Sequence, residues 1–204
     1  MAAITEEAKR LFRARATVRE MLRDRGFVVS VPRSEASMDS FASYLLSVDN
    51  DYMLCITAKK KRKKVLVFFP TEPKLGVKPI RETIAYLEKQ NSKHAIIVFK
   101  EAITPFAQRE IDEDISKRVL VEKFKLETLL YNVTHHSGVP KHTTLTRQER
   151  DKYLHDNNLV ADKLPKIYST DPVIHYYGLK RGQMVKIERF SPEGHAFYYH
   201  RIVV

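Results

Sequence analysis

The stretch TDPVIHYYGLKRGQ, residues 170–183, contains the start and the stop of one short helix. Asp171 is a preferred N-cap residue, and Pro172 suits the first helical position, where the missing backbone N–H costs nothing. Gly178 readily adopts the left-handed conformation that ends many helices. The stretch therefore predicts a helix of barely two turns, followed by a pair of basic residues.

The segments around this helix predict a small α+β unit. Thr146-Arg-Gln-Glu149 matches the capping box that opens a helix, here running to about Asn157. Met184–Phe190 alternates apolar and charged residues, residues 191–194 favour a turn, and residues 195–204 indicate a second long strand. These two strands predict an antiparallel hairpin.

The sequence before this unit shows a different pattern, in which helical and strand-like segments alternate. The apolar residues from Ile4 to Arg25 recur at helical spacing, and Gly26 supplies the helix stop. Strands are expected at 27–31, 52–57, 65–69 and 94–99 and near 119–121, and further helices at 40–48, 79–90 and 105–116. This alternation predicts an α/β layered domain.

The composition changes after Thr134, where a polar segment with glycine and proline follows at 135–142. Such residues are typical of a link between folded units. We therefore expect two domains, an α/β domain over 1–134 and an α+β unit over 143–204.

Composition limits the partners and the compartment. The 204-residue chain carries a formal net charge of +11, which favours a polyanion, with nucleic acid first and an acidic membrane surface second. The single cysteine, Cys55, excludes an internal disulfide framework and fits a reducing compartment. No signal peptide and no apolar segment of about 20 residues is visible, so no membrane anchor is expected.

Part of the charge is concentrated in a run of basic residues between two expected strands. The run comprises Lys59, Lys60, Lys61, Arg62, Lys63 and Lys64. In some proteins such a run is a nuclear localisation signal or a contact to DNA phosphates, but between two strands it is commonly a solvated hairpin tip. All three interpretations stay open at this point.

Two other groups of residues invite a binding role. The histidines His135, His136 and His142 lack a cysteine partner and a regular helical spacing, so a structural role is favoured and no metal is expected. Tyr176 and Tyr177 carry the aromatic faces that stack on bases in single-strand binders. Packing of one ring in the core and burial of the other in an interface is the favoured interpretation.

Residues 171–189, DPVIHYYGLKRGQMVKIER, resemble the assembly domain of the fifth subunit shared by the eukaryotic nuclear RNA polymerases, whose archaeal counterpart consists of this domain alone. VPKH at 139–142 and RIVV at 201–204 extend this similarity. The first domain is similar to the same family at Arg23-Asp-Arg-Gly26, Val67-Phe-Phe-Pro70, Glu72-Pro-Lys74, Ile97-Val98, Thr104-Pro105 and Asn132-Val-Thr134. The resemblance thus covers nearly the whole chain, and the presence of both domains implies a eukaryotic type.

This resemblance implies an accessory subunit of the nucleus with no active site, cofactor or metal of its own. Its fold would combine an α/β jaw domain, related to restriction endonucleases but non-catalytic, with a small α+β assembly domain. The jaw would lie beside the downstream DNA duplex without reading its sequence. The assembly domain would anchor the chain to the largest polymerase subunit and so join it to the other polymerase subunits, with no membrane partner.

The resemblance also assigns candidate site residues. The anchoring residues are Asp171, Pro172, Tyr176, Tyr177, Gly178, Lys180, Arg181, Gly182 and Gln183. The residues expected near DNA are the basic run Lys59 to Lys64 and an exposed loop made of Thr104, Pro105, Phe106 and Ala107. Tight capping would give the anchor a fixed surface, because a rigid element loses less entropy on docking.

Three places depart from the usual pattern of that family. They are His135-His-Ser-Gly138, residues 190–193 with the sequence FSPE, and Phe106, where serine is common. These departures raise a divergent paralogue dedicated to one polymerase as an alternative to a subunit that serves all nuclear polymerases.

Two further functions are weighed against the polymerase subunit. Nucleases of the PD-(D/E)xK type hold magnesium with an Asp and a Glu-x-Lys motif on neighbouring strands. Glu72-Pro73-Lys74 matches the second motif, and Asp49 and Asp51 lie upstream, but Pro70 and Pro73 are expected to take this segment out of the sheet. The other alternative is a free-standing basic DNA-binding protein, although no recognition helix with base-reading side chains is visible.

Overall fold

The computed structural model describes residues 5–47, 54–61 and 63–204, and the chain divides into two compact units, Met1–Tyr131 and Asn132–Val204. Residues 135–142, which we expected as a linker, fall inside the second unit. The side chain of Asn132 explains why this unit begins early, because its amide nitrogen donates to the Tyr176 hydroxyl at 3.0 Å. This hydrogen bond ties the first residue of the unit to its short helix.

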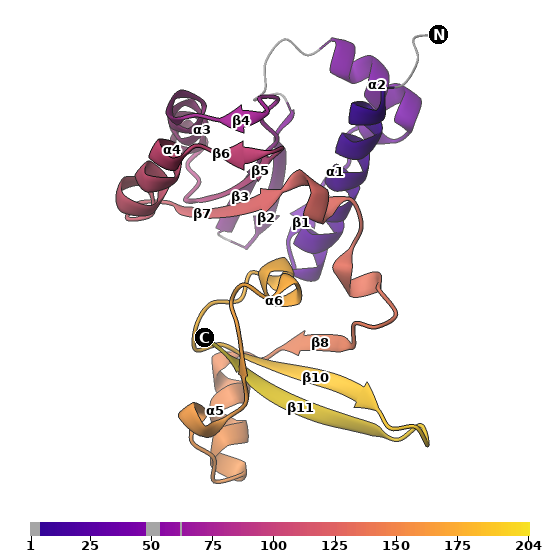
Figure 1. Ribbon diagram of the computed structural model, residues 1–204, viewed down its shortest axis with the longest axis vertical. Coiled ribbons are helices and arrows are strands. Elements are labelled where there is room, and N and C mark those ends of the chain that lie inside the picture. Colours follow the sequence, from indigo (N-terminus) through magenta and orange to yellow (C-terminus); the bar gives the residue numbers. More distant parts are fainter. Residues whose placement is uncertain (1–4, 48–53, 62) are drawn as a thin grey trace. The chain divides into compact units, whose positions relative to one another are not determined.

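A five-stranded sheet forms the centre of the first unit, with the strand order β1-β2-β3-β5-β7 (Figure 1). Its strands are β1 (Val28–Val29), β2 (Ile56–Lys60), β3 (Lys63–Phe68), β5 (His94–Phe99) and β7 (Leu120–Lys125). β3, β5 and β7 run parallel, whereas β1 and β2 are antiparallel to their neighbours. The amino ends of the three parallel strands therefore share one edge of the sheet, and their carboxyl ends share the opposite edge.

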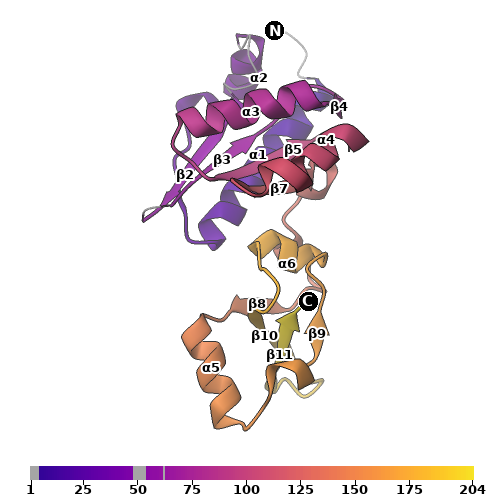
Figure 2. The ribbon, with the colours of Figure 1, turned by 90° about the vertical axis from the view of Figure 1, so that its left-hand side faces the viewer.

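Helices cover both faces of this sheet. α1 (Glu6–Asp24) lies on one face, and α3 (Val77–Lys89) and α4 (Pro105–Glu110) lie on the other (Figures 1 and 2). The core beneath α3 and α4 contains the buried residues Leu66, Phe68, Ile80, Ile84, Leu87, Ala95, Ile97, Ala107 and Ile111. Burial on both faces explains why the central strands read as continuous apolar runs.

α1 is the first element of the chain and contacts the last segment of its unit. It ends at Asp24, and the expected stop Gly26 follows its C-cap Arg25 with φ 79°. It packs against α2 (Met38–Leu46) and against the 3₁₀ turn Leu126–Leu129. Arg10 of α1 pairs with Glu127 of that turn at 3.6 Å. The two ends of the first unit's sequence thus lie side by side.

α1 also carries two buried arginines. Arg15 donates to both carboxylate oxygens of Glu35, at 3.0 and 2.6 Å, and to the backbone oxygen of Leu54. Arg19 forms an ion pair with the same carboxylate. Burial lowers the pKa of Arg15 and of Arg19 to about 10. One carboxylate therefore compensates two buried cations, and its removal would leave both without an opposite charge.

Two elements of the first unit differ from the expectation. β2 begins at Ile56, and the first two residues of the strand expected at 52–57 lie outside the described residues. The helix expected at 105–116 is α-helical only as far as Glu110 and continues as a π-helical turn, Ile111–Ile115. Both Ile111 and Ile115 are buried, so the wider turn keeps both apolar side chains in the core.

The second unit contains a four-stranded sheet with the order β8-β10-β11-β9. Its elements are β8 (Lys141–Thr144), α5 (Arg147–Asp156), β9 (Lys166–Ile167), α6 (Pro172–Tyr177), β10 (Met184–Phe190) and β11 (Ala196–Val203). β10 and β11 form the expected antiparallel hairpin. The expected capping box is present, since the Thr146 hydroxyl accepts from the Glu149 backbone N–H at 3.2 Å. In the described part of the chain, no helix is long and apolar enough to span a bilayer.

Candidate functional site

The central helix of the expected anchor, α6, is held at both ends by short hydrogen bonds. The Asp171 carboxylate accepts from two backbone N–H groups of the first turn, at 2.9 and 3.3 Å. Gly178 has φ 65° and donates to the His175 carbonyl at 3.0 Å. Leu179 donates to the Ile174 carbonyl at 3.1 Å and packs against the core that contains Ile174. These bonds form a Schellman motif, so the predicted start and stop of the helix are both confirmed.

The residues after α6 form a turn that is closed by backbone and side-chain bonds. The Gln183 backbone N–H donates to the Lys180 carbonyl at 3.0 Å, and the Gln183 side-chain oxygen accepts the Lys180 N–H at 2.6 Å. Gly182 has φ 82° and donates to the Val203 carbonyl at 2.9 Å, which ties the turn to β11. Lys180 and Arg181 are exposed. The turn therefore carries two positive charges on a fixed backbone.

The two tyrosines of α6 lie in different environments. Tyr176 is 3% exposed and accepts a hydrogen bond from Asn132, whereas Tyr177 is half-buried. Their rings meet edge to face with 5.3 Å between centroids. Packing of one tyrosine in the core is thus confirmed, and burial makes base stacking on Tyr176 impossible. An interface role for Tyr177 stays a prediction.

A cavity of about 350 Å³ adjoins the turn within the second unit. It is lined by Leu145, Thr146, Arg147, Arg150, Arg181, Gly182, Gln183 and Met184. Arg150 donates to the Gly182 carbonyl at 2.9 Å and pairs with Asp151 at 2.7 Å. Arg150 was not expected in the anchor, because only the folded chain brings α5 beside the turn. Three arginines make this a concave basic surface that suits carboxylate groups.

The basic run forms the hairpin between β2 and β3, so its expected position at a hairpin tip is confirmed. Lys59, Lys60, Lys63 and Lys64 belong to the strands, Lys61 occupies the turn with φ 51°, and Arg62 lies outside the described residues. Lys60 donates to the Arg25 carbonyl at 2.5 Å, and Lys64 donates to the Gln90 carbonyl at 3.1 Å. Lys59, Lys61 and Lys63 are exposed. Contact of this run with DNA stays a prediction.

The segment 104–107, expected as an exposed loop, is instead the start of α4. The Thr104 hydroxyl accepts from the Ala107 backbone N–H at 3.4 Å, and Pro105 occupies the first turn. Ala107 is fully buried, whereas Phe106 is 77% exposed. The expectation of a loop was wrong because Thr-Pro is itself a helix start, with the threonine as N-cap and the proline in the first turn. Ala107 is therefore not available to a partner.

The two groups of residues expected near DNA lie at opposite edges of the sheet. Lys63 begins β3, and Lys64 reaches Gln90 in the turn that precedes β5. Thr104 follows the carboxyl end of β5 and donates its N–H to the Leu75 carbonyl at 3.0 Å. β5 is 6 residues long, so roughly 20 Å separates the two edges. The structure thus does not bring these two groups together.

The Glu72-Pro73-Lys74 motif does not extend the five-stranded sheet. β3 ends at Phe68, and β4 (Lys74–Leu75) pairs with β6 (Ala102–Ile103) in a separate two-stranded sheet. The segment therefore leaves the main sheet, as its prolines predicted. Asp49 and Asp51 lie outside the described residues. Within those residues, no three His, Cys, Asp or Glu side chains are grouped so as to hold a metal ion.

The histidines of the second unit make local contacts. His136 Nδ1 accepts from the Gly138 backbone N–H at 3.1 Å, and His142 Nδ1 lies 2.6 Å from the Pro140 carbonyl oxygen. Burial lowers the pKa of His142 and so favours its neutral form. Nδ1 of a neutral His142 then donates to the carbonyl, which gives this side chain a structural role.

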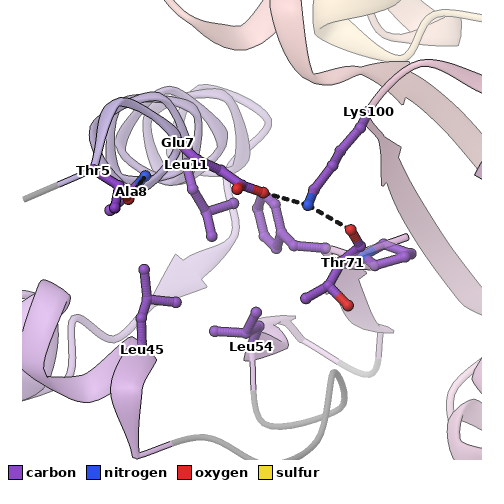
Figure 3. Close-up of a pocket in the computed structure, with 10 residues that line it drawn as sticks. Thr5, Glu7, Ala8, Leu11, Leu45, Leu54, Thr71 and Lys100 are labelled. Atoms are coloured by element: carbon purple, nitrogen blue, oxygen red, sulfur yellow. Dashed lines mark hydrogen bonds and ion pairs between the residues drawn. The ribbon is translucent and has the colours of Figure 1, made fainter. Parts of the chain in front are cut away.

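A second concave site lies in the first unit, between α1, α2 and the end of β3 (Figure 3). Its volume is about 190 Å³, and its lining includes Leu11, Leu45 and Leu54. At its rim, Lys100 bonds to the Glu7 carboxylate and to the Thr71 carbonyl. The acidic and the basic side chain of the lining therefore neutralise each other, and the site offers an apolar surface.

Comparison with known proteins gives matches over nearly the whole chain. Residues 5–87 match the N-terminal domain model of RNA polymerase Rpb5, and residues 131–203 match the C-terminal domain model. The chain is 36% identical over 200 residues to subunit rpabc1 of DNA-directed RNA polymerases I, II and III from Dictyostelium discoideum, covering 98% of this chain and 100% of that protein. It is 33% identical to the DNA-directed RNA polymerase subunit 5-like protein 1 of Arabidopsis thaliana, over the full length of both chains. It is 32% identical to RPABC1 of Caenorhabditis elegans, over 97% of each chain.

Proposed function

The chain belongs to the RNA polymerase Rpb5 family, and on this premise we propose that its second unit anchors it to the largest subunit of the polymerase while its first unit lies beside the downstream DNA duplex. It is a subunit of a DNA-directed RNA polymerase and takes part in transcription as a member of that complex. Other polymerase subunits are therefore its partners. A nuclear location and the lack of its own active site belong to the proposal.

One observation supports the anchor above all others, namely the fixed basic turn after α6. Lys180 and Arg181 project from a backbone that is closed by Gln183 and fastened to β11 through Gly182. Such a surface loses little conformational entropy when a partner binds. The neighbouring cavity adds Arg147 to the same basic surface, so we expect the partner segment to carry carboxylate groups.

The DNA contact rests on charge and on the family's architecture. The chain has a net charge of +11, and Lys59, Lys61 and Lys63 of its basic run are exposed at a hairpin tip. Lysines at such a tip neutralise phosphates without reading bases, which fits a subunit that must tolerate any transcribed sequence. Phe106 is 77% exposed at the opposite edge of the sheet and is a second candidate contact.

A capture experiment from native extract tests the anchor. Tagged full-length chain is used to isolate the largest polymerase subunit, and the double variant Lys180→Ala/Arg181→Ala is expected to retain at least about tenfold less of it. The matched control is Lys152→Ala/Lys163→Ala, which removes the same charge from two exposed lysines of the same unit. Normal capture by the first variant, or equal loss in both, would show that the basic turn is not the anchor.

The same experiment separates the two units. Replacing all lysines and the arginine of the basic run by glutamine should leave capture unchanged, while the assembled elongation complex should become less resistant to salt. A basic-run variant that drops out of the polymerase would reverse the assignment of the two units. The polymerase that co-elutes with the parent chain identifies whether this chain serves one nuclear polymerase or several. A free-standing DNA-binding protein would elute with none.

A further inference from the structure

The edge of the first unit that holds the amino ends of β3, β5 and β7 collects basic residues from separate parts of the sequence. The hairpin tip lies just before β3, the turn at 90–93 just before β5, and the turn at 116–119 just before β7. The three strands are parallel and adjacent in the order β3-β5-β7, so these three segments must lie next to one another. The sequence alone shows only the first of them as basic.

Most of the positive charge at this edge has no opposite charge beside it. The side chains of Lys61, Lys63, Lys89 and Lys93 are exposed, and none of them makes a hydrogen bond or an ion pair with any residue that the structure describes. Lys117 and Arg118 are also exposed, and their partners are single carboxylates. Arg118 lies 3.3 Å from Glu88, and Lys117 lies 4.0 Å from Asp114, both at exposed positions where pairing is weak. The edge is therefore strongly cationic.

Hydrogen bonds join these segments into one surface. Lys64 Nζ donates to the carbonyl and to the side-chain oxygen of Gln90, at 3.1 and 2.9 Å. The Ser92 hydroxyl donates back to the Lys64 carbonyl at 2.7 Å, and the Leu120 N–H donates to the Lys93 carbonyl at 2.9 Å. The hairpin and the two turns are thus fixed to one another. One basic side chain, Lys64, is used for this purpose, and the others remain available to a ligand.

The surface is also concave. A cavity of about 440 Å³ lies between the two turns, and its lining includes Asn91, Ser92, Lys93, Lys117 and Arg118. No aromatic side chain is among its lining residues, so it lacks the stacking faces that single-strand binders use. A nucleic-acid duplex, which is convex and regularly charged and has its bases turned inward, fits this surface better than an unpaired strand does.

We propose that this surface, formed by Lys61, Lys63, Lys89, Lys93, Lys117 and Arg118 and named here the basic edge, binds the phosphate backbone of duplex DNA. From β2 to β7 the edge spans three strand spacings, or about 14 Å. Phosphates on one DNA strand advance about 3.4 Å along the axis per residue, so the edge has room for about four of them. This binding does not depend on the anchor in the second unit. Only the identification of the bound duplex as downstream DNA rests on the function proposed above.

The test measures binding of the purified full-length chain to a fluorescent DNA duplex between about 50 and 200 mM salt. The variant Lys93→Gln/Lys117→Gln changes only residues outside the basic run. If both lysines contact phosphates, the slope of log K against log salt should fall by about 1.8, which is roughly a 60-fold loss of affinity near 0.1 M salt. The matched control is Lys74→Gln/Lys78→Gln, which removes two exposed lysines at the opposite edge. This control should bind like the parent.

Three outcomes would overturn the proposal. The first is an unchanged slope in Lys93→Gln/Lys117→Gln with a normal far-ultraviolet spectrum, and the second is an equal loss in the opposite-edge control. The third is binding of a poly-glutamate chain as tightly as the duplex, which would assign the edge to an acidic protein. Each of these results is independent of capture of the largest polymerase subunit, so failure here is distinguishable from failure of the anchor.

Discussion

Replacing Gly178 by valine tests whether the left-handed stop of α6 supports the anchor. Gly178 has φ 65° and ψ 34°, a conformation that costs a residue with a Cβ atom about 1–2 kcal/mol. A β-branched side chain is more restricted still, so we expect a loss of about 2–3 kcal/mol in the free energy of unfolding of the second unit. For a domain of about 60–100 residues, each kcal/mol lowers Tm by about 4–8 °C. The expected decrease is therefore roughly 8–24 °C.

The measurement is thermal unfolding of a fragment covering residues 132–204, followed by circular dichroism. Gly178→Asn is the matched control, because asparagine adds a side chain but tolerates the left-handed region. It should cost less than about 1 kcal/mol, and in the full-length chain it should capture the largest polymerase subunit better than the valine variant. A valine variant that melts like the parent would refute the role of the cap. Equal losses for valine and asparagine would show that backbone conformation is not the cause.

Three further predictions concern the first unit. Glu35→Gln should destabilise it by about 3–5 kcal/mol in urea unfolding, because two buried arginines lose their counter-charge. Glu127→Gln breaks exposed ion pairs with Arg10 and Lys125 and should cost no more than about 1 kcal/mol. Similar losses for the two variants would contradict this contrast. Burial raises the pKa of Glu122, but the hydrogen bond from His94 and the charge of Arg25 outweigh it and hold that pKa below its usual value. The folded state then binds fewer protons than the unfolded state. The contribution of the Glu122 carboxylate to stability is therefore complete above about pH 4.5 and is lost as the pH falls through the pKa of the folded state. The urea midpoint of Glu122→Gln should depend less on pH than that of the parent. Finally, purified chain should not cut duplex DNA in magnesium, and cleavage that disappears in Glu72→Ala would restore the nuclease alternative.

The elements that could be predicted from the sequence are those with local signals. The stop at Gly178 and the capping box at Thr146 each depend on a few neighbouring residues and were found where expected. The β10–β11 hairpin also follows from alternation and a short turn. In each case the residues that decide the structure are adjacent in the chain, so the pattern contains the whole physical cause.

The features that could not be predicted depend on contacts between distant segments. Glu35 is an ordinary acidic residue in the sequence, and only the fold places it against Arg15 and Arg19. Lys93 and Lys117 become part of one basic surface because parallel strands bring their amino ends together. The segment 104–107 was misassigned for another reason, since proline is typical both of loops and of the first turn of a helix.

The contact between α1 and the turn Leu126–Leu129 has a consequence for synthesis of the chain. About 100 residues separate the end of α1 from this turn, and ribosomes add roughly 5–20 residues per second. α2 follows soon after this helix, but the helix must wait about 5–20 s before the turn that covers its other contacts is made. During that interval part of its surface is open to other chains and to chaperones, which makes the first unit the vulnerable part of the newly made protein. The second unit closes mainly through contacts within its own short sequence and can fold soon after it emerges.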